Sequence, residues 1–286
     1  MEVFRAIPDD LSPAAVAGVD AMLAAIRQEE GVDIPLAIES GSRAWGFPSP
    51  DSDYDCRFIY VRPARHHLTI WPRRDVIERP ISDELDVNGW DLSKALRLAL
   101  KGNAVVIEWL QSPIVYSADP VFRDDLLAFA ERFTDRARLA SHYLHLGQRQ
   151  VARHLAEPQN VALKKIFYAL RPTAALRWLR LHPDRTLPPM HFPTLVSQGD
   201  LSQEVRDLID DLMAQKAVSR EMGVGLMPAS ILAFVREELE KAAALDGLER
   251  RPVTDQARSA ADALFEATTL RLGSARRTAT PLLEPV

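Results

Sequence analysis

The chain has 286 residues and a formal net charge of −5, and its 26% charged and 47% hydrophobic residues are ordinary for a globular protein. This length can bury a substantial core without disulfides, and the one cysteine, Cys56, cannot pair within the chain. The acidic balance argues against a protein that coats nucleic acid through bulk charge, while leaving room for local basic patches.

Nothing in the sequence indicates a membrane protein. The N-terminus lacks a basic start followed by an apolar run, and no window approaches the roughly 18 consecutive apolar residues that a membrane helix requires. Together with the lone thiol, which suits a reducing compartment, this predicts a cytoplasmic protein with no membrane partner.

Residues 1–118 alternate between helix and strand patterns. Ser12-Pro13 supplies an N-cap and a proline at the first helical position, so a first helix is expected to run to Gly31. Short apolar or β-branched runs predict strands at residues 34–38, 53–61, 84–90 and 114–116. Helical spacing predicts helices at residues 92–100 and 105–111. A basic, proline-punctuated stretch from Arg62 to Arg79 interrupts these elements.

From residue 119 onward the strand patterns disappear. Long Ala/Leu/Arg/Glu-rich runs predict helices at residues 121–133, 137–155, 161–181, 204–220, 229–245 and 253–272. Residues 183–193 are expected to form a proline-rich connection, and the tail 274–286 is expected to be disordered. The prediction is an α/β (α+β) protein with two domains, residues 1–118 with a mixed sheet and flanking helices and residues 119–286 entirely helical.

The most specific local signal is Gly41-Ser42 followed, ten residues later, by Asp53-Tyr54-Asp55. Side chains alternate along a strand, so Asp53 and Asp55 should share one face, about 6 to 7 Å apart, while Tyr54 turns into the core. Two carboxylates together can hold Mg²⁺, or Mn²⁺, with the remaining ligands supplied by substrate phosphates.

The Gly41-Ser42 turn itself is a candidate phosphate site. A glycine there allows backbone N–H groups and the Ser42 hydroxyl to approach a phosphate closely, and Arg43 could pair with a triphosphate.

A third carboxylate commonly completes such a metal site, and two residues compete for this role. Asp86 lies in the predicted strand at residues 84–90, on the face opposite Leu85 and Val87. Asp91 is the rival, but it has a good structural role as the N-cap of the helix at residues 92–100, so Asp86 is preferred. Trp90 shares the face of Asp86 and could stack on a base.

The segment SGSRAWGFPSPDSDYDCRFIYV resembles the signature of the polymerase β nucleotidyltransferase superfamily, a glycine followed by Gly or Ser, a spacer of about ten residues, and Asp-x-Asp or Asp-x-Glu in a strand. Ser40 departs from that signature, which usually has an apolar residue before the glycine. More closely, DVNGWDLSKALRLALKGNAVVIEWLQSPIVY and LKKIFYALRPTAALRW resemble the YcgL-type, RNA-ligase-associated polymerase-β-like proteins.

This resemblance implies a mixed sheet with flanking helices and transfer of a nucleoside monophosphate from an NTP, expected to be ATP, with release of pyrophosphate. It implies no stable cofactor beyond the metal. The catalytic and metal-binding residues would then be Asp53, Asp55 and Asp86.

A basic stripe in the helical half is a further candidate for nucleotide binding. Lys164, Tyr168 and Arg171 fall at i, i+4 and i+7, so they share one helix face, and Lys165 is adjacent. The stripe could reach over the active site and hold phosphates or a base. The alternative is a solvated basic face beside an apolar one.

The acceptor is left open between several hypotheses. One is an RNA end, as in RNA repair, and another is a hydroxyl of a protein or a small molecule, which the acidic composition makes a serious rival. A third hypothesis is a non-catalytic nucleotide-binding module.

Overall fold

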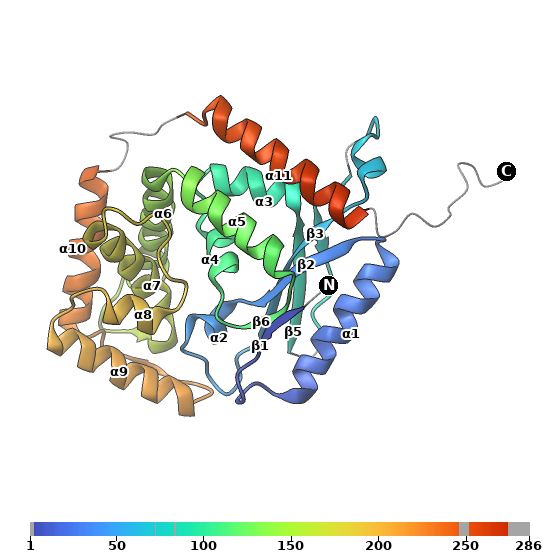
Figure 1. The fold of residues 1–286 in the computed structure, drawn as a ribbon. Helices are drawn as coiled ribbons and strands as arrows, with labels where there is room; N and C mark the ends of the chain where they lie inside the picture. Colours follow the sequence, from blue (N-terminus) through green and yellow to red (C-terminus); the bar gives the residue numbers. More distant parts are fainter. Residues whose placement is uncertain (1–2, 72, 83, 246–251, 274–286) are drawn as a thin grey trace.

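The computed structural model describes residues 3–71, 73–82, 84–245 and 252–273. A six-stranded sheet lies in the half of the molecule that contains the N-terminus, and a group of helices lies beside it (Figure 1). The predicted class, a mixed sheet with flanking helices and a helical C-terminal region, is confirmed. The predicted disordered tail at residues 274–286 lies outside the described residues.

The sheet has the strand order β1-β6-β2-β3-β5-β4, in which β3 and β5 are parallel and the other neighbours are antiparallel. Its strands are β1 (Phe4–Ala6), β2 (Asp33–Glu39), β3 (Tyr54–Val61), β4 (Val76–Glu78), β5 (Leu85–Asp91) and β6 (Val115–Ala118). The four strands predicted from the sequence are β2, β3, β5 and β6. The other two, β1 and β4, have three residues each and were not predicted.

Helix α1 (Pro13–Glu29) covers one face of the sheet, and α3 (Leu92–Leu100), α4 (Ala104–Gln111) and α5 (Pro120–Phe133) lie on the other (Figure 1). The first face buries Cys56, Phe58 and Tyr60 of β3 against α1, while Ile59 and Val61 belong to the core on the second face. This alternation is the two-residue period of a strand that is covered on both sides.

In the second half, helix α7 (Leu163–Leu181) is largely buried, and α6 (Arg136–His154), α8 (Phe192–Ser197) and α10 (Ala229–Leu245) pack against it. Helix α9 (Gln203–Val218) packs on α10, and α11 (Asp255–Gly273) lies over the sheet half (Figure 1). A two-stranded ribbon of β7 (Val161–Ala162) and β8 (Val224–Gly225) also lies here, so this half is not entirely helical. No helix of the described residues is both long and apolar enough to cross a membrane.

The two halves share one hydrophobic core that runs from Leu36 of β2 to Leu272 of α11. Helix α5 packs on β2, α3 and α4, and α11 returns across the sheet layer to contact α3, α5 and β3 (Figure 1). The division into domains at residues 118 and 119 stays a prediction, and α5 and α11, which lie beyond it in the chain, contribute to the layer that covers the sheet.

Candidate active site

The turn after β2 brings the backbone against a strand carboxylate. Gly41 has φ +60°, in the left-handed region, and it begins the short helix α2 (Gly41–Trp45). A Cβ atom added to Gly41 would lie 1.9 Å from Oδ2 of Asp55. Glycine is therefore required here both by its backbone conformation and by the close approach of Asp55.

Replacing Gly41 with alanine is expected to cost roughly 3 kcal/mol of stability, because left-handed strain and a steric clash with Asp55 add together. The matched control is Gly31→Ala, since Gly31 has φ +62° and open space around its Cβ position. That control should cost about 1 kcal/mol from backbone strain alone. Urea unfolding of both variants measures the difference, and equal costs would show that Asp55 does not crowd the turn.

Asp53 and Asp55 lie where the sequence pattern predicts them. Asp53 is exposed, one residue before β3, while Asp55 is half-buried within the strand. Tyr54 and Cys56 between and after them are buried on the opposite face. Burial raises the pKa of Asp55, an effect that Arg57 opposes and the charges of Asp86 and Asp53 reinforce.

The guanidinium of Arg57 lies between the carboxylates of Asp55 and Asp86, and this contact was not predicted from the sequence. The two aspartates are register partners in the parallel pair β3–β5. Nη2 of Arg57 donates to Oδ1 of Asp55 at 2.8 Å and to Oδ2 of Asp86 at 2.7 Å, and Nη1 donates to the carbonyl of Asp86 at 2.8 Å. The Arg57 side chain is 15% exposed, so this cation is held largely within the protein.

The carboxylates supply only part of the ligand set that a divalent cation needs. Among the described residues, no three side chains of Asp, Glu, His or Cys come close enough to form a metal cluster. Asp55 and Asp86 nevertheless converge on one positive charge, that of Arg57. Mg²⁺ is often held by one or two carboxylates with substrate phosphates, so Asp55 and Asp86, with Asp53 exposed two residues before Asp55, could hold the ion only together with such further ligands.

Asp91, the rival third carboxylate, has the structural role expected of it. It is buried, and its Oδ1 accepts hydrogen bonds from the backbone N–H and the hydroxyl of Ser93 at 2.9 and 2.6 Å. It therefore caps α3. Trp90 packs on Trp109, with ring centroids 4.1 Å apart, and remains partly exposed.

Three serines join the glycine turn to the loop before β3. The Ser42 hydroxyl donates to Oγ of Ser52 at 2.8 Å, and Ser49 lies 3.0 Å from the same oxygen. Arg43 braces this loop, because its guanidinium donates to the carbonyls of Ser52 at 2.6 Å and Asp53 at 3.2 Å. Ser42 lines the pocket described next, but Arg43 does not.

A pocket of about 530 Å³ lies between the sheet and the helical half. Gly41, Ser42, Asp53, Asp55 and Arg57 line the sheet side. The helical side carries Lys164, Lys165, Tyr168 and Lys216. Asp53 and Asp55 thus face Lys164, Lys165 and Lys216 across one cavity, whose lining also contains Asp51 and Glu221.

The basic stripe predicted on α7 divides between two environments. Lys164 and Tyr168 line the pocket with Lys165, and Nζ of Lys164 is 3.1 Å from Oδ2 of Asp51. Arg171 lies outside the pocket, buried in an ion pair with Glu108 and 4.1 Å above the ring of Trp45. The stripe is therefore neither a wholly solvated face nor a wholly pocket-lining one, and Arg171 contributes to the core between α4 and α7.

Lys216 of α9 is a pocket residue that the sequence analysis missed. Its side chain is 5% exposed, its Nζ donates to the carbonyl of Phe47, and it lies 5.0 Å from the centre of the Phe47 ring. Burial, followed by the charge of Lys164, lowers the pKa of Lys216 to about 8. No local motif marks this lysine, because it reaches the pocket only through tertiary packing.

The affinity of this pocket for a phosphate compound such as an NTP should therefore fall as pH rises through about 8. Because burial lowers the pKa of folded Lys216 to about 8, well below the usual range of a lysine, the pocket loses a positive charge there. Losing a charge-assisted hydrogen bond should cost about tenfold in affinity. Equilibrium binding between pH 6.5 and 9.5 measures this. Lys216→Arg should flatten the profile, and an unaltered decline in that variant would assign the effect to another group.

Glu39 of β2 supports the strand that carries Asp55 and was also missed. It is fully buried, its Oε1 accepts from the backbone N–H of Asp55 at 2.8 Å, and the Tyr116 hydroxyl donates to its Oε2. Burial raises its pKa to about 7, against the opposing effect of these two hydrogen bonds. A buried carboxyl with two partners fixes the backbone at Asp55.

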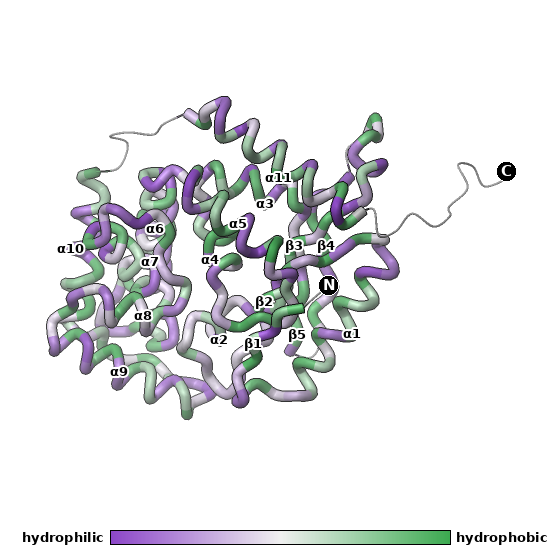
Figure 2. The backbone as a smooth tube through the Cα atoms, viewed as in Figure 1, coloured by the Kyte–Doolittle hydropathy of each residue, from purple (hydrophilic) through white to green (hydrophobic). Residues whose placement is uncertain are grey.

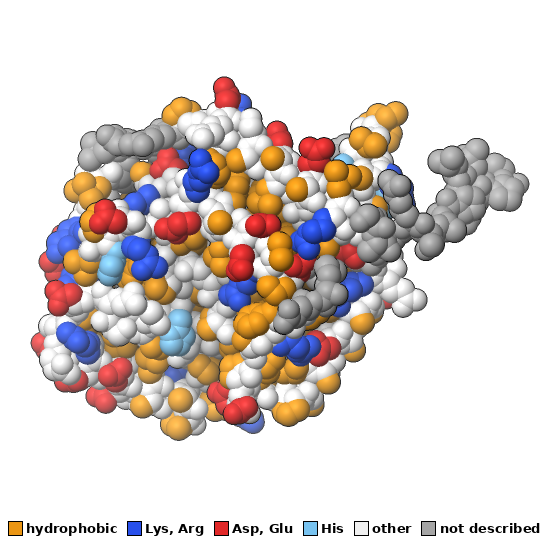
Figure 3. Space-filling view, viewed as in Figure 1, with side chains coloured by type: hydrophobic (Ala, Val, Ile, Leu, Met, Phe, Trp, Pro, Cys, Tyr) orange, Lys and Arg blue, Asp and Glu red, His pale blue; other side chains and the backbone are white. Residues whose placement is uncertain are grey.

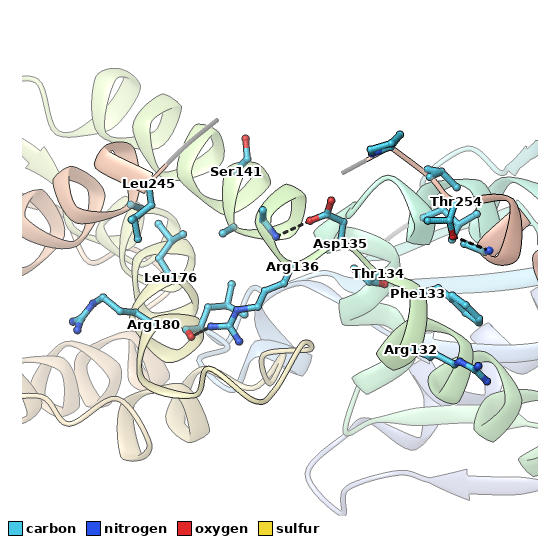
Figure 4. A pocket seen from close by; sticks show the side chains of 18 of the residues that line it. Arg132, Phe133, Thr134, Asp135, Arg136, Ser141, Leu176, Arg180, Leu245 and Thr254 are labelled. Atoms are coloured by element: carbon cyan, nitrogen blue, oxygen red, sulfur yellow. Dashed lines mark hydrogen bonds between the residues drawn. The ribbon is translucent and has the colours of Figure 1, made fainter. Parts of the chain in front are cut away.

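A larger cavity of about 820 Å³ lies away from these residues, between α5, α6, α7, α10 and α11 (Figure 4). Two of its arginines are already engaged. Arg136 donates to the carbonyls of His182 at 2.7 Å and Pro183 at 2.9 Å, and Arg180 pairs with Glu238 at 2.7 Å. The acidic and basic walls of the smaller pocket make it the better candidate for nucleotide chemistry.

Comparisons with known proteins identify the family of the chain. The family described as RlaP, the RNA repair pathway DNA polymerase beta family, matches residues 17–267. The Bacillus subtilis (strain 168) protein named "Uncharacterized protein YcgL" is 41% identical over 217 residues, which cover 76% of this chain and 82% of that relative. The chain therefore belongs to the RNA repair pathway DNA polymerase beta family, and this membership implies nucleotidyltransferase activity in RNA repair.

Proposed function

We propose that the protein transfers a nucleoside monophosphate from an NTP, with ATP as the expected donor, to a hydroxyl at an RNA end and releases pyrophosphate. The main support for the proposal is one pocket in which Asp53 and Asp55 lie across from three lysines, Lys164, Lys165 and Lys216. Membership of a polymerase-β-like RNA repair family supports both the type of reaction and the acceptor.

The sheet wall is suited to the reacting end of the triphosphate. Asp53 and Asp55, which line the pocket, would hold Mg²⁺ or Mn²⁺ together with Asp86, which does not line the pocket but pairs with the same arginine as Asp55. When bound, the metal would neutralise phosphate charge and stabilise the attacking and leaving oxygens. The carboxylates alone would repel a triphosphate, so this wall requires the cation.

The helical wall is suited to the rest of the nucleotide. Lys164 and Lys165 present ammonium groups at the start of α7, and Lys216 adds a third from α9. Tyr168 is 38% exposed in the same pocket and offers an aromatic surface for a base. Binding would replace the contact between Lys164 and Asp51 with one to phosphate.

In the proposed reaction the acceptor hydroxyl oxygen forms a bond to the α-phosphorus. The bond from that phosphorus to the oxygen bridging to the β-phosphate breaks, pyrophosphate leaves, and the hydroxyl proton is lost to water. Both walls act chiefly by positioning the reactants and neutralising charge, as is general for such displacements.

The acceptor is tested by incubating the protein with each α-labelled NTP, Mg²⁺ or Mn²⁺, and a panel of acceptors. The panel holds RNA with a free 3′ hydroxyl, the same RNA ending in a 3′ phosphate, a protein mixture, and aminoglycosides. We expect label on the RNA with the free hydroxyl. Label on a polypeptide or a small molecule instead would establish the rival acceptor class, and NTP binding without transfer would favour a non-catalytic module.

A further inference from the structure

The loop between β3 and β4 differs from the rest of this acidic protein. Residues 62–75 contain four arginines and two histidines against one aspartate. At its tip Leu68, Ile70 and Trp71 are 85%, 89% and 81% exposed. The loop rises at the end of β3 in Figure 1, with a hydrophobic tip in Figures 2 and 3.

The base of the loop concentrates positive charge. Arg65 and Arg73 are exposed and approach His66, whose pKa is lowered by burial first and then by their charges. His67 holds the loop in place, because its ring packs 4.9 Å from that of Phe265 on α11. Apolar side chains and cations are thus presented together by an anchored segment.

The positively charged surface at the base of the loop extends onto α3. Asp75, the acidic residue of the loop, lies 3.0 Å from Nζ of Lys94 and 3.3 Å from Nη2 of Arg97. Two cations meet one carboxylate there, so the local charge stays positive. Lys94 also lies 5.8 Å from the centre of the Trp90 ring.

A band of half-buried side chains connects the loop with the active site. Asp86, Asn88 and Trp90 alternate along one face of β5, and each is partly exposed. Asp86 is beside Asp55, whereas Trp90 is opposite Val76, where the loop returns to the sheet. The band therefore starts at the carboxylates and ends beneath the basic loop.

We propose that single-stranded RNA runs from the active site along β5 to this loop, where Trp71 stacks on a base and Arg65 and Arg73 contact phosphates. The inference rests on the proposed RNA acceptor and adds where that RNA binds. Cations beside an exposed aromatic ring are the combination that binds single-stranded nucleic acid without reading its sequence.

The length of β3 sets the length of RNA that can reach the loop. From Asp55 to Val61 the strand advances six residues, about 20 Å at its usual rise. That distance corresponds to about six nucleotide steps of a stacked strand. An RNA of four nucleotides held in the active site is too short to reach Trp71, and one of 20 nucleotides spans the distance.

The test is fluorescence anisotropy of end-labelled RNAs of 4 and 20 nucleotides, without NTP, on the full chain. Trp71→Ala should weaken binding of the 20-nucleotide RNA roughly 5- to 10-fold, because one base stack is lost, and should change the short RNA far less. Arg73→Gln should lower the slope of log affinity against log salt by about 0.7 for the long RNA.

Two variants serve as matched controls. Val121→Ala removes an exposed apolar side chain of α5, and Arg236→Gln removes an exposed charge of α10. Both should bind either RNA as the unaltered protein does. Equal binding of the long RNA by Trp71→Ala and the unaltered protein would overturn the inference. Loss of binding to phosphatidylserine vesicles in that variant, with RNA binding unchanged, would assign the loop to a membrane surface instead.

The result of this RNA-binding test can be told apart from the result of the label-transfer test of the proposed function. If the unaltered protein transfers label to RNA but Trp71→Ala binds long RNA normally, the RNA path alone is wrong. If no label is transferred to RNA but Trp71→Ala weakens binding of long RNA, the path stands and the proposed reaction is wrong.

Discussion

Replacing Arg57 with glutamine is expected to lower the melting temperature in metal-free buffer and to make that temperature strongly dependent on Mg²⁺. Arg57 is the cation between Asp55 and Asp86, so its loss leaves two carboxylates facing each other. Breaking a fully buried pair costs about 3 to 5 kcal/mol, and partial exposure reduces this to about 2 kcal/mol. The melting temperature should fall by roughly 5 °C.

Millimolar Mg²⁺ should reverse most of this fall in the melting temperature of Arg57→Gln, because a divalent cation can replace the guanidinium between the carboxylates. The matched control is Arg79→Gln, since Arg79 pairs with Glu29 and Glu30 of α1 on the other side of the sheet. Its melting temperature should not respond to Mg²⁺ beyond that of the unaltered protein. If Mg²⁺ stabilises Arg57→Gln no more than Arg79→Gln, Asp55 and Asp86 do not bind the metal together.

Replacing Asp55 with asparagine is expected to reduce the rate of nucleotidyl transfer by about 10³-fold, because the charge stabilisation supplied through a bound metal is worth several kcal/mol. The amide has nearly the same shape as the carboxylate, and Arg57 retains its contact with Asp86. The fold should therefore persist, which circular dichroism can verify while single-turnover kinetics measure the rate.

Asp51→Asn is the control for this substitution. Asp51 lines the same pocket but is exposed and pairs with Lys164 rather than with Arg57. Its replacement should change the rate by no more than a few fold. Comparable losses in both variants would mean that Asp55 acts through the general charge of the pocket rather than as a metal ligand.

The parts of the site that follow from the sequence are those set by short-range rules. The alternation of a strand placed Asp53 and Asp55 away from Tyr54 and Cys56, as observed. Capping chemistry likewise assigned Asp91 to α3, as its hydrogen bond to Ser93 confirms. Each rule depends on residues no more than a few positions apart.

The parts that could not be predicted depend on long-range packing. The contact between Arg57 and Asp86 requires the parallel register of β3 and β5 across 29 positions. Lys216 meets the carbonyl of Phe47 across 169 positions. Arg171 shares a helix face with Lys164 and Tyr168, but buried Glu108 of α4 binds its guanidinium outside the pocket. Periodicity gives the face of a helix, not what packs against each turn of it.

Several elements of the fold were missed for similar reasons. Strands β1 and β4 have three residues each, which is too short for an alternation pattern, and they exist because β6 and β5 supply hydrogen-bonding edges. Helix α8 begins at Phe192, within the run assigned to a proline-rich connection, with Pro193 in its first turn. Proline at that position is compatible with a helix start.

Nucleotidyl transfer at this site is tested most directly by following both ends of the triphosphate in one reaction with Mg²⁺ and RNA carrying a free 3′ hydroxyl. With α-labelled ATP, the RNA should be lengthened by one labelled nucleotide, and with γ-labelled ATP the label should appear in pyrophosphate alone. Asp53→Ala should abolish both products. Label from the γ-phosphate on RNA, or transfer unchanged in Asp53→Ala, would contradict nucleotidyl transfer at this site.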